Sequence, residues 1–268
     1  MGARSTPSQG SRRVAVLGAS NVALGLPWLV RAARESTTRA GGPELLVAGG
    51  HGRSYGLPTR VLGRSLSGLL DCGVWRHLGN PSQRDPPLVV LTDIGNDLMY
   101  GVAPERLASW VGTCLERLPA DARVTVVGPP LATLAELGPV RFLVLRTLFF
   151  PARRMTLRHL REALDRLAHG MRSLADRDPR VALVEPPARW YGLDPIHTRA
   201  RHREEAWRSI LGIRDAAREP APSSQPVRPA ERVRAWTARP ESWALFGVAC
   251  GSRQPSLRLD DGTSLWLY

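Results

Sequence analysis

The sequence predicts an α/β fold around a central, mostly parallel five-stranded sheet. Short apolar runs alternate with amphipathic segments at spacings typical of βαβ units. Residues 88–92 are nearly all apolar, as expected of a strand buried on both faces of a parallel sheet. A chain of 268 residues can bury one full core and carry a small appendage.

The expected elements follow one another in strand–helix order. We expect five strands, at residues 12–18, 44–48, 88–92, 123–127 and 181–184. We expect five helices, at residues 22–34, 58–71, 103–118, 155–176 and 199–211. The pattern is strongest at 155–176, where apolar residues recur at steps of three and four.

The chain divides into four expected parts. Residues 1–11 are expected to be a disordered lead, and residues 12–212 form the α/β domain. Prolines and serines predict a linker over 213–239. Residues 240–268 are expected to be a small appendage, with a β-hairpin around Asp260-Asp261-Gly262.

An apolar segment at residues 142–150 leaves three interpretations open. The three are a helix buried beside the sheet, a lid over an acyl pocket and an interfacial contact. As a helix it is only ~15 Å long, too short to cross a bilayer.

Composition restricts the partners. The net charge is +13, but the chain has no lysine, so all 37 basic residues are arginines. They are spread along the chain rather than gathered in one stripe, and part of the excess reflects arginine-rich coding, so we expect no specific nucleic-acid partner. A nucleotide-binding protein remains an alternative, although a Gly-Lys-Ser/Thr loop is ruled out by the absence of lysine.

Cysteine usage and the N-terminal residues favour a cytoplasmic protein. The three cysteines (Cys72, Cys114 and Cys250) have no metal-ligand spacing and are expected to be reduced. Residues 1–13 are polar, unlike a secretory signal, and no window approaches the ~20 apolar residues of a transmembrane segment.

Three polar segments are expected at the carboxyl edge of the sheet, where open α/β sheets bind ligands. Ser20 follows the first strand, Asn96 follows the third, and Asp194 and His197 follow the fifth. A serine hydroxyl needs a neighbouring base to become a nucleophile, and histidine is the usual base. A carboxylate fixes the tautomer of that histidine, so Ser20, His197 and Asp194 together predict a nucleophilic site.

Acyl transfer also requires hydrogen-bond donors for a developing oxyanion. The N–H of Ser20, a glycine N–H from the loop at 49–56 and the side-chain amide of Asn96 are candidates. Both Gly50 and Gly52 could supply the glycine N–H, and the two-glycine spacing favours Gly52.

These four blocks, in this order, resemble the SGNH/GDSL hydrolase family of esterases, lipases and related acyl-group enzymes. The resemblance covers residues 12–212 and implies a flavodoxin-like three-layer α/β/α sandwich that cleaves small-molecule esters without a cofactor or a metal. It implies that Ser20 is the nucleophile, His197 the base and Asp194 its orienting carboxylate. Gly52 and Asn96 would complete the oxyanion hole with Ser20.

The resemblance has three departures, at Ala19, Asn21 and Ile94. Ala19 stands where the family's first block has aspartate, and Ile94 stands where its third block has glycine. Asp97 is similar to the family's structural aspartate. Asn21 replaces a usually apolar residue and is a candidate to brace the turn.

Other candidates have weaker support. Asn21, His51, Trp190 and Tyr191 are candidate substrate-binding residues, with rim or core positions as the alternatives. We expect a serine esterase; an acyltransferase with a hydroxyl acceptor and a catalytically silent binding protein remain alternatives. The C-terminal hairpin could cap the sheet or support a homodimer.

Overall fold

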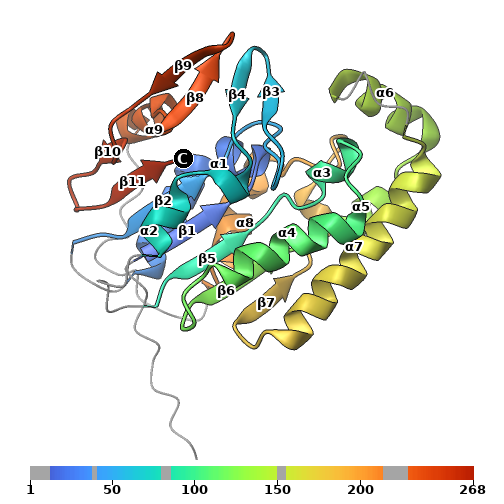
Figure 1. Cartoon of the computed structure of the whole chain (residues 1–268), viewed down its shortest axis with the longest axis horizontal. Helices are drawn as coiled ribbons and strands as arrows, with labels where there is room; N and C mark the ends of the chain where they lie inside the picture. The colour runs from blue at the N-terminus through green and yellow to red at the C-terminus, as the bar shows by residue number, and fades with distance from the viewer. Residues whose placement is uncertain (1–12, 38–40, 80–85, 150–154, 214–228) are drawn as a thin grey trace, which may run out of the picture.

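The computed structural model of the chain describes residues 13–37, 41–79, 86–149, 155–213 and 229–268 (Figure 1). The expected lead at 1–11 lies outside this described part, as do residues 214–228 of the expected linker and Phe150 of the apolar segment.

The central sheet has seven strands in the order β10-β11-β2-β1-β5-β6-β7. Its strands are β1 (Arg13–Leu17), β2 (Glu44–Ala48), β5 (Leu88–Leu91), β6 (Arg123–Val127), β7 (Val181–Val184), β10 (Leu257–Arg258) and β11 (Ser264–Leu267). The five expected strands are all present and parallel, in the flavodoxin-like order β2-β1-β5-β6-β7. The expected count of five is wrong because the C-terminal hairpin joins the sheet, with β11 parallel to β2.

Helices cover both faces of the sheet, which confirms the three-layer α/β/α class (Figure 1). One face packs against α1 (Ser20–Ser36) and α8 (Arg203–Ile210), and the other against α4 (Pro104–Glu116) and α7 (Leu157–Arg177). Alternate residues of each strand point to opposite faces. In β1, Val14 and Val16 therefore join the core below α1, and Ala15 and Leu17 join the core below α4.

The described segments contain five further helices and three 3₁₀ turns. They are α2 (Val74–Leu78), α3 (Asn96–Met99), α5 (Leu131–Ala135), α6 (Pro139–Phe149) and α9 (Pro229–Thr237), with 3₁₀ turns at Leu69–Asp71, Ala188–Trp190 and Ala200–His202.

The helix expected at 58–71 is wrong. The segment forms a hairpin of β3 (Thr59–Val61) and β4 (Arg64–Leu66) instead. Leu62 and Gly63 turn the chain with φ of 48° and 80°, and Leu62 is 94% exposed, so the leucine spacing does not mark a buried helix face. The hairpin continues through β8 (Ser242–Leu245) and β9 (Val248–Gly251) into a second, antiparallel sheet.

Two further segments differ from expectation. Residues 229–237 of the expected linker form α9, which packs Ala235 into the core beside α1. In α6, Phe142 is buried but Leu143 and Val144 are 51% and 59% exposed, so the helix is not buried all round.

The loops after β1, β5 and β7 meet at the carboxyl edge of the sheet. Chain connections leave β1 and β5 in opposite directions, which makes this edge a topological switch point. Within the residues described, no helix is long and apolar enough to cross a membrane.

Candidate active site

Ser20 is the first residue of α1 and follows a tight turn from β1. The N–H of Gly18 donates to the carbonyl of Ala48 at the end of β2. A Cβ on Gly18 would lie 2.6 Å from a methyl carbon of Thr92 and 2.7 Å from one of Val22, so only glycine fits without displacing these side chains. The turn therefore holds Ser20 against the neighbouring strand.

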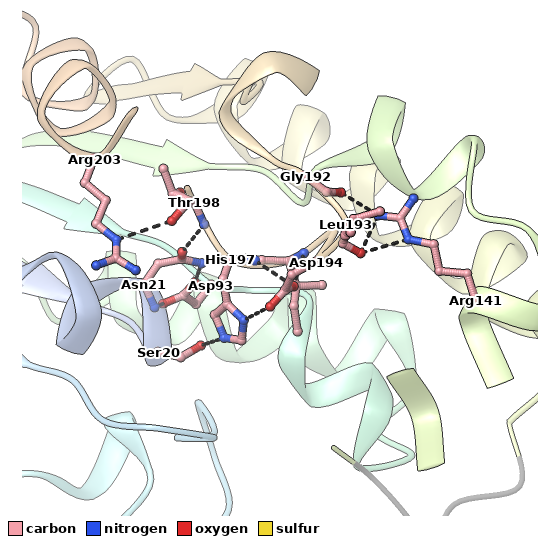
Figure 2. A network of polar contacts seen from close by, with 11 residues as sticks. Ser20, Asn21, Asp93, Arg141, Gly192, Leu193, Asp194, His197, Thr198 and Arg203 are labelled. Atoms are coloured by element: carbon pink, nitrogen blue, oxygen red, sulfur yellow. Dashed lines mark hydrogen bonds and ion pairs between the residues drawn. The ribbon is translucent and has the colours of Figure 1, made fainter. Parts of the chain in front are cut away.

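The structure brings Ser20, His197 and Asp194 into one hydrogen-bonded chain (Figure 2). The Oγ of Ser20 lies 2.8 Å from Nε2 of His197, and Nδ1 of the same ring lies 2.5 Å from Oδ2 of Asp194. These distances suit proton transfer between the hydroxyl and the imidazole.

Asp194 also organises its own loop. Its Oδ1 accepts the backbone N–H groups of Ile196 at 3.0 Å and His197 at 3.2 Å. Desolvation acts to raise the pKa of Asp194, but the hydrogen bond and charge of His197, with these two N–H groups, outweigh it and leave the pKa below its ordinary value. Asp194 is therefore an ionised acceptor for Nδ1–H, which directs the lone pair of Nε2 toward Ser20.

A second carboxylate, which the sequence did not indicate, braces the serine turn. Oδ2 of Asp93 accepts the backbone N–H groups of Ala19 at 2.7 Å and Asn21 at 3.2 Å. These groups open α1, where backbone donors lack helical acceptors and the helix dipole favours an anion. Asp93 has a φ of 60°, a conformation that aspartate tolerates better than most residues. Desolvation raises its pKa, although the bonds from Asn21 and Ala19 oppose the shift.

Asn21 connects the serine turn to the histidine loop. Its Nδ2 donates to Oδ1 of Asp93 at 2.6 Å and to the carbonyl of Ile196 at 2.9 Å. Its Oδ1 accepts the N–H of Thr198 at 2.8 Å. The Asn21 side chain thus binds the backbone on both sides of His197, as a brace rather than as an exposed substrate contact.

Arginines hold the same loop from its two sides (Figure 2). Arg141 of α6 donates through Nε to the carbonyl of Leu193 at 2.8 Å and also bonds the carbonyl of Gly192. Arg203 of α8 donates to the carbonyl of Thr198 at 3.3 Å. The loop that carries Asp194 is therefore fixed before and after the pair.

In the glycine loop, the two candidate oxyanion donors, Gly50 and Gly52, have different hydrogen bonds. The N–H of Gly50 donates to the carbonyl of Ala19 at 3.3 Å. Gly52 has a φ of 64°, and its carbonyl accepts the hydroxyl of Tyr100 at 2.6 Å. Neither the N–H of Gly52 nor the side-chain amide of Asn96 donates to any residue in the described segments. Both are thus available to a ligand.

The carboxylate of Asp97 is bonded to the glycine loop, which gives it a structural role. It accepts the Ser54 hydroxyl and, at 3.2 Å, the N–H of Tyr55, so it anchors the glycine loop to α3. Desolvation raises its pKa to about 6, with the bonds from Ser54 and Tyr55 opposing the shift.

The remaining candidates divide between two cavities. Trp190 and Tyr191 are 2% and 8% exposed and, with Asn21, line a mainly apolar cavity of about 90 Å³ behind the histidine loop. His51 lines a separate groove of about 320 Å³. Trp190 and Tyr191 are core residues, since both pack in the cluster below α1 and α8.

Cys72 and Cys114 are buried, and desolvation raises the pKa of Cys114 to about 12. No group of three or more His, Cys, Asp or Glu side chains suited to a metal ion occurs in the part of the chain described.

No family model and no curated protein matches this chain. Solved structures similar to it include a carbohydrate acetylesterase family member from Sinorhizobium meliloti, at 14% identity over 75% of this chain and 99% of that one, with a TM-score of 0.48. They also include the native aryl esterase of M. smegmatis, at 16% identity over 75% and 94%, with a TM-score of 0.47. The inhibitor-bound form of that esterase is 14% identical over 75% and 96%, with a TM-score of 0.49.

Proposed function

We propose that this protein is an SGNH-type serine hydrolase that cleaves a carboxylic ester through an acyl-enzyme on Ser20, with residues 12–212 carrying the chemistry. The observation that carries the proposal is the unbroken hydrogen-bonded chain from Ser20 through His197 to Asp194. Ser20 and the Asp194/His197 pair come from segments about 175 residues apart in the sequence. The donor–acceptor order of the chain is that of a nucleophile, a base and an orienting carboxylate.

Each step follows from this order. His197 Nε2 takes the hydroxyl proton as Ser20 Oγ bonds to the ester carbon, whose carbonyl oxygen becomes an oxyanion. The carbonyl then re-forms, the bond to the alcohol oxygen breaks, and the leaving alkoxide takes the proton from His197. Water attacks the acyl-enzyme with the same base, and release of the acid returns the proton to Ser20.

We propose that the oxyanion is bound by the N–H groups of Ser20 and Gly52 and by the amide of Asn96. The N–H of Ser20 lies in the first turn of α1, where helical acceptors are absent. Gly52 and Asn96 hold donors that no described residue uses, whereas the N–H of Gly50 is already bonded to Ala19. Such preorganised donors stabilise charge that develops in the transition state.

The direct test is labelling with a fluorophosphonate, which reacts with an activated serine. Wild type should be labelled and Ser20→Ala should not. Ser109→Ala, which changes an exposed serine of α4, should be labelled like wild type. Failure of the folded wild type to react would contradict the proposal and favour a silent binding protein.

Turnover of 4-nitrophenyl acetate then distinguishes the two acyl-transfer activities. A hydrolase releases acetate and 4-nitrophenol in equal amounts in water alone. An acyltransferase would instead form a new ester when a hydroxyl acceptor is supplied, with little release of acetate.

A further inference from the structure

A second groove lies beside the proposed triad and is lined by two arginines, Arg64 and Arg203. It has a volume of about 320 Å³ and lies between the start of α1, the end of β2, β4 and α9. Gly50 and His51 line its near end, and the N–H of Gly50 bonds the residue before Ser20. Partial burial lowers the pKa of His51, followed by the charges of His197 and Arg64, so both groups are near His51.

Arg64 lines this groove without a carboxylate partner. Its Nε is buried and has no hydrogen-bond acceptor, and no ion pair to its guanidinium occurs among the residues described. Desolvation lowers the pKa of Arg64, followed by the like charge of Arg239. A partly buried cation of this kind is costly unless an anion joins it.

Arg203 lines the same groove and adds a second cation. It donates to the carbonyls of Thr198 and Leu24, and within the described segments it has no acidic partner. Desolvation lowers its pKa as well.

Among the three buried arginines of the described segments, Arg13 and Arg34 pair with carboxylates, whereas Arg53 donates to backbone carbonyls and to the Ser67 hydroxyl. Arg13 pairs with Glu44 at 2.8 Å, and Arg34 pairs with Asp261 at 2.5 Å. Arg64 and Arg203 differ from Arg13 and Arg34 in having no carboxylate partner within the described segments.

We propose that this groove is an anion subsite, in which Arg64 and Arg203 bind a carboxylate carried by the ester substrate. The inference rests on the proposed esterase function and names its substrate class. Apolar side chains, including Leu26 and Trp236, also line the groove. The groove therefore suits a short hydrocarbon segment that carries a terminal carboxylate, and an arginine fork matches a carboxylate with two hydrogen bonds.

Two ester pairs test the subsite and locate the charge. Mono-4-nitrophenyl succinate carries the carboxylate on the acyl side, with 4-nitrophenyl butyrate as its neutral counterpart. 4-Acetoxybenzoate carries it on the alcohol side, with phenyl acetate as its neutral counterpart. Wild type should favour the anionic member of at least one pair about tenfold or more in kcat/KM, and Arg64→Gln should reduce that ratio about tenfold through KM.

Arg60→Gln is the matched control, because Arg60 is an exposed arginine on β3 of the same hairpin. It should leave the ratio unchanged, and Arg64→Lys should recover part of it, since a lysine keeps the charge but loses the fork. Thermal unfolding of each variant checks that the hairpin remains folded.

Calorimetry separates this inference from the function itself. Ser20→Ala should bind monomethyl succinate, and the Ser20→Ala/Arg64→Gln double variant should bind it about tenfold more weakly. If wild type is labelled by fluorophosphonate but prefers neither anionic ester, the subsite is refuted and the esterase stands. If wild type is not labelled but Arg64-dependent binding persists, the esterase fails and the anion subsite stands. Binding that is equal in the single and double variants overturns the subsite.

Discussion

Asn21 and Asp93 share a hydrogen bond of 2.6 Å, from Nδ2 to Oδ1, that joins two halves of the candidate site. Asp93 holds the backbone that carries Ser20, and Asn21 holds the backbone that carries His197. Ser20 and His197 are therefore positioned by one continuous network, although neither Asn21 nor Asp93 touches the Ser20 hydroxyl in the described contacts.

Replacement of Asp93 tests the first half of this network. Asp93→Asn keeps the tolerance for a positive φ but offers one oxygen where three donors now bond the carboxylate. We expect the free energy of unfolding to fall by about 1–3 kcal/mol, because buried donors lose their acceptor. We expect kcat to fall about 10- to 100-fold because Ser20 shifts from its position.

Chemical denaturation and ester turnover measure these two effects. A positioning role predicts that kcat falls much more than KM changes. A variant that is less stable but retains wild-type kcat below its unfolding transition would show that Asp93 only stabilises the turn.

Replacement of Asn21 tests the second half. Asn21→Ala removes both bonds to the histidine loop, at Ile196 and Thr198, while the two backbone bonds that Asp93 accepts remain available. We expect kcat to fall about tenfold or more, since a loosened loop lengthens the distance from Nε2 to Oγ. The Asn21→Ala/Asp93→Asn double variant should lose less than the product of the single effects, because the two side chains act through one network. Fully multiplicative losses would contradict that coupling.

The sequence predicted Ser20, Asn96, Asp194 and His197 at one edge because the carboxyl ends of parallel strands must meet there. Asp93 was missed because its partners lie 72 and 74 residues earlier, and a lone aspartate after a strand carries no local signal for them. The sequence has Ala19 where the first block of the family has a carboxylate. In the structure the carboxylate of Asp93, in the loop after β5, bonds the backbone of this turn instead.

The errors in the fold have the same origin in long-range pairing. Leucines between 62 and 70 satisfy a helical period, but β4 pairs with β8, which lies about 180 residues later in the sequence. The hairpin at 257–267 was predicted from its turn residues, and β10 and β11 confirm it. Local sequence does not predict that β11 also pairs with β2. The two strands are parallel, so no short turn with recognisable residues connects them.

Asp97 predicts a specific pH dependence of stability. Its pKa is raised from the ordinary 3.8 to about 6 in the folded protein, so the folded state binds more protons than the unfolded state between these values. The contribution of Asp97 to stability is thus greatest below about pH 4 and is lost as the pH rises through about 6. The size of the loss is on the order of 3 kcal/mol.

Asp97→Asn removes this titration, so urea unfolding at pH 4 and pH 7 should reveal it. The difference in the free energy of unfolding, variant minus wild type, should be more positive at pH 7 than at pH 4 by roughly 3 kcal/mol. Carboxylates with a lowered pKa, such as Asp194, make stability rise with pH in both proteins. This contribution cancels when the variant is compared with wild type. An equal difference at both pH values would show that Asp97 ionises normally.

Asp194→Asn separates orientation of His197 from folding of its loop. Oδ1 of an asparagine can still accept the N–H groups of Ile196 and His197, so the turn should persist. The amide at the position of Oδ2 is a donor, and it forces Nδ1 to become the acceptor. The proton then resides on Nε2, which can no longer accept the proton of Ser20, and we expect kcat to fall about 10⁴-fold with little change in KM.

The His197→Ala variant provides the comparison that makes this result decisive. If Asp194 acts through His197, the Asp194→Asn/His197→Ala double variant should be no slower than His197→Ala alone, since the orienting group has nothing left to orient. Thermal unfolding near that of wild type would confirm that the loop survives in Asp194→Asn. A further large loss in the double variant would instead give Asp194 a role independent of the imidazole, and the proposed order of nucleophile, base and orienting carboxylate would have to be abandoned.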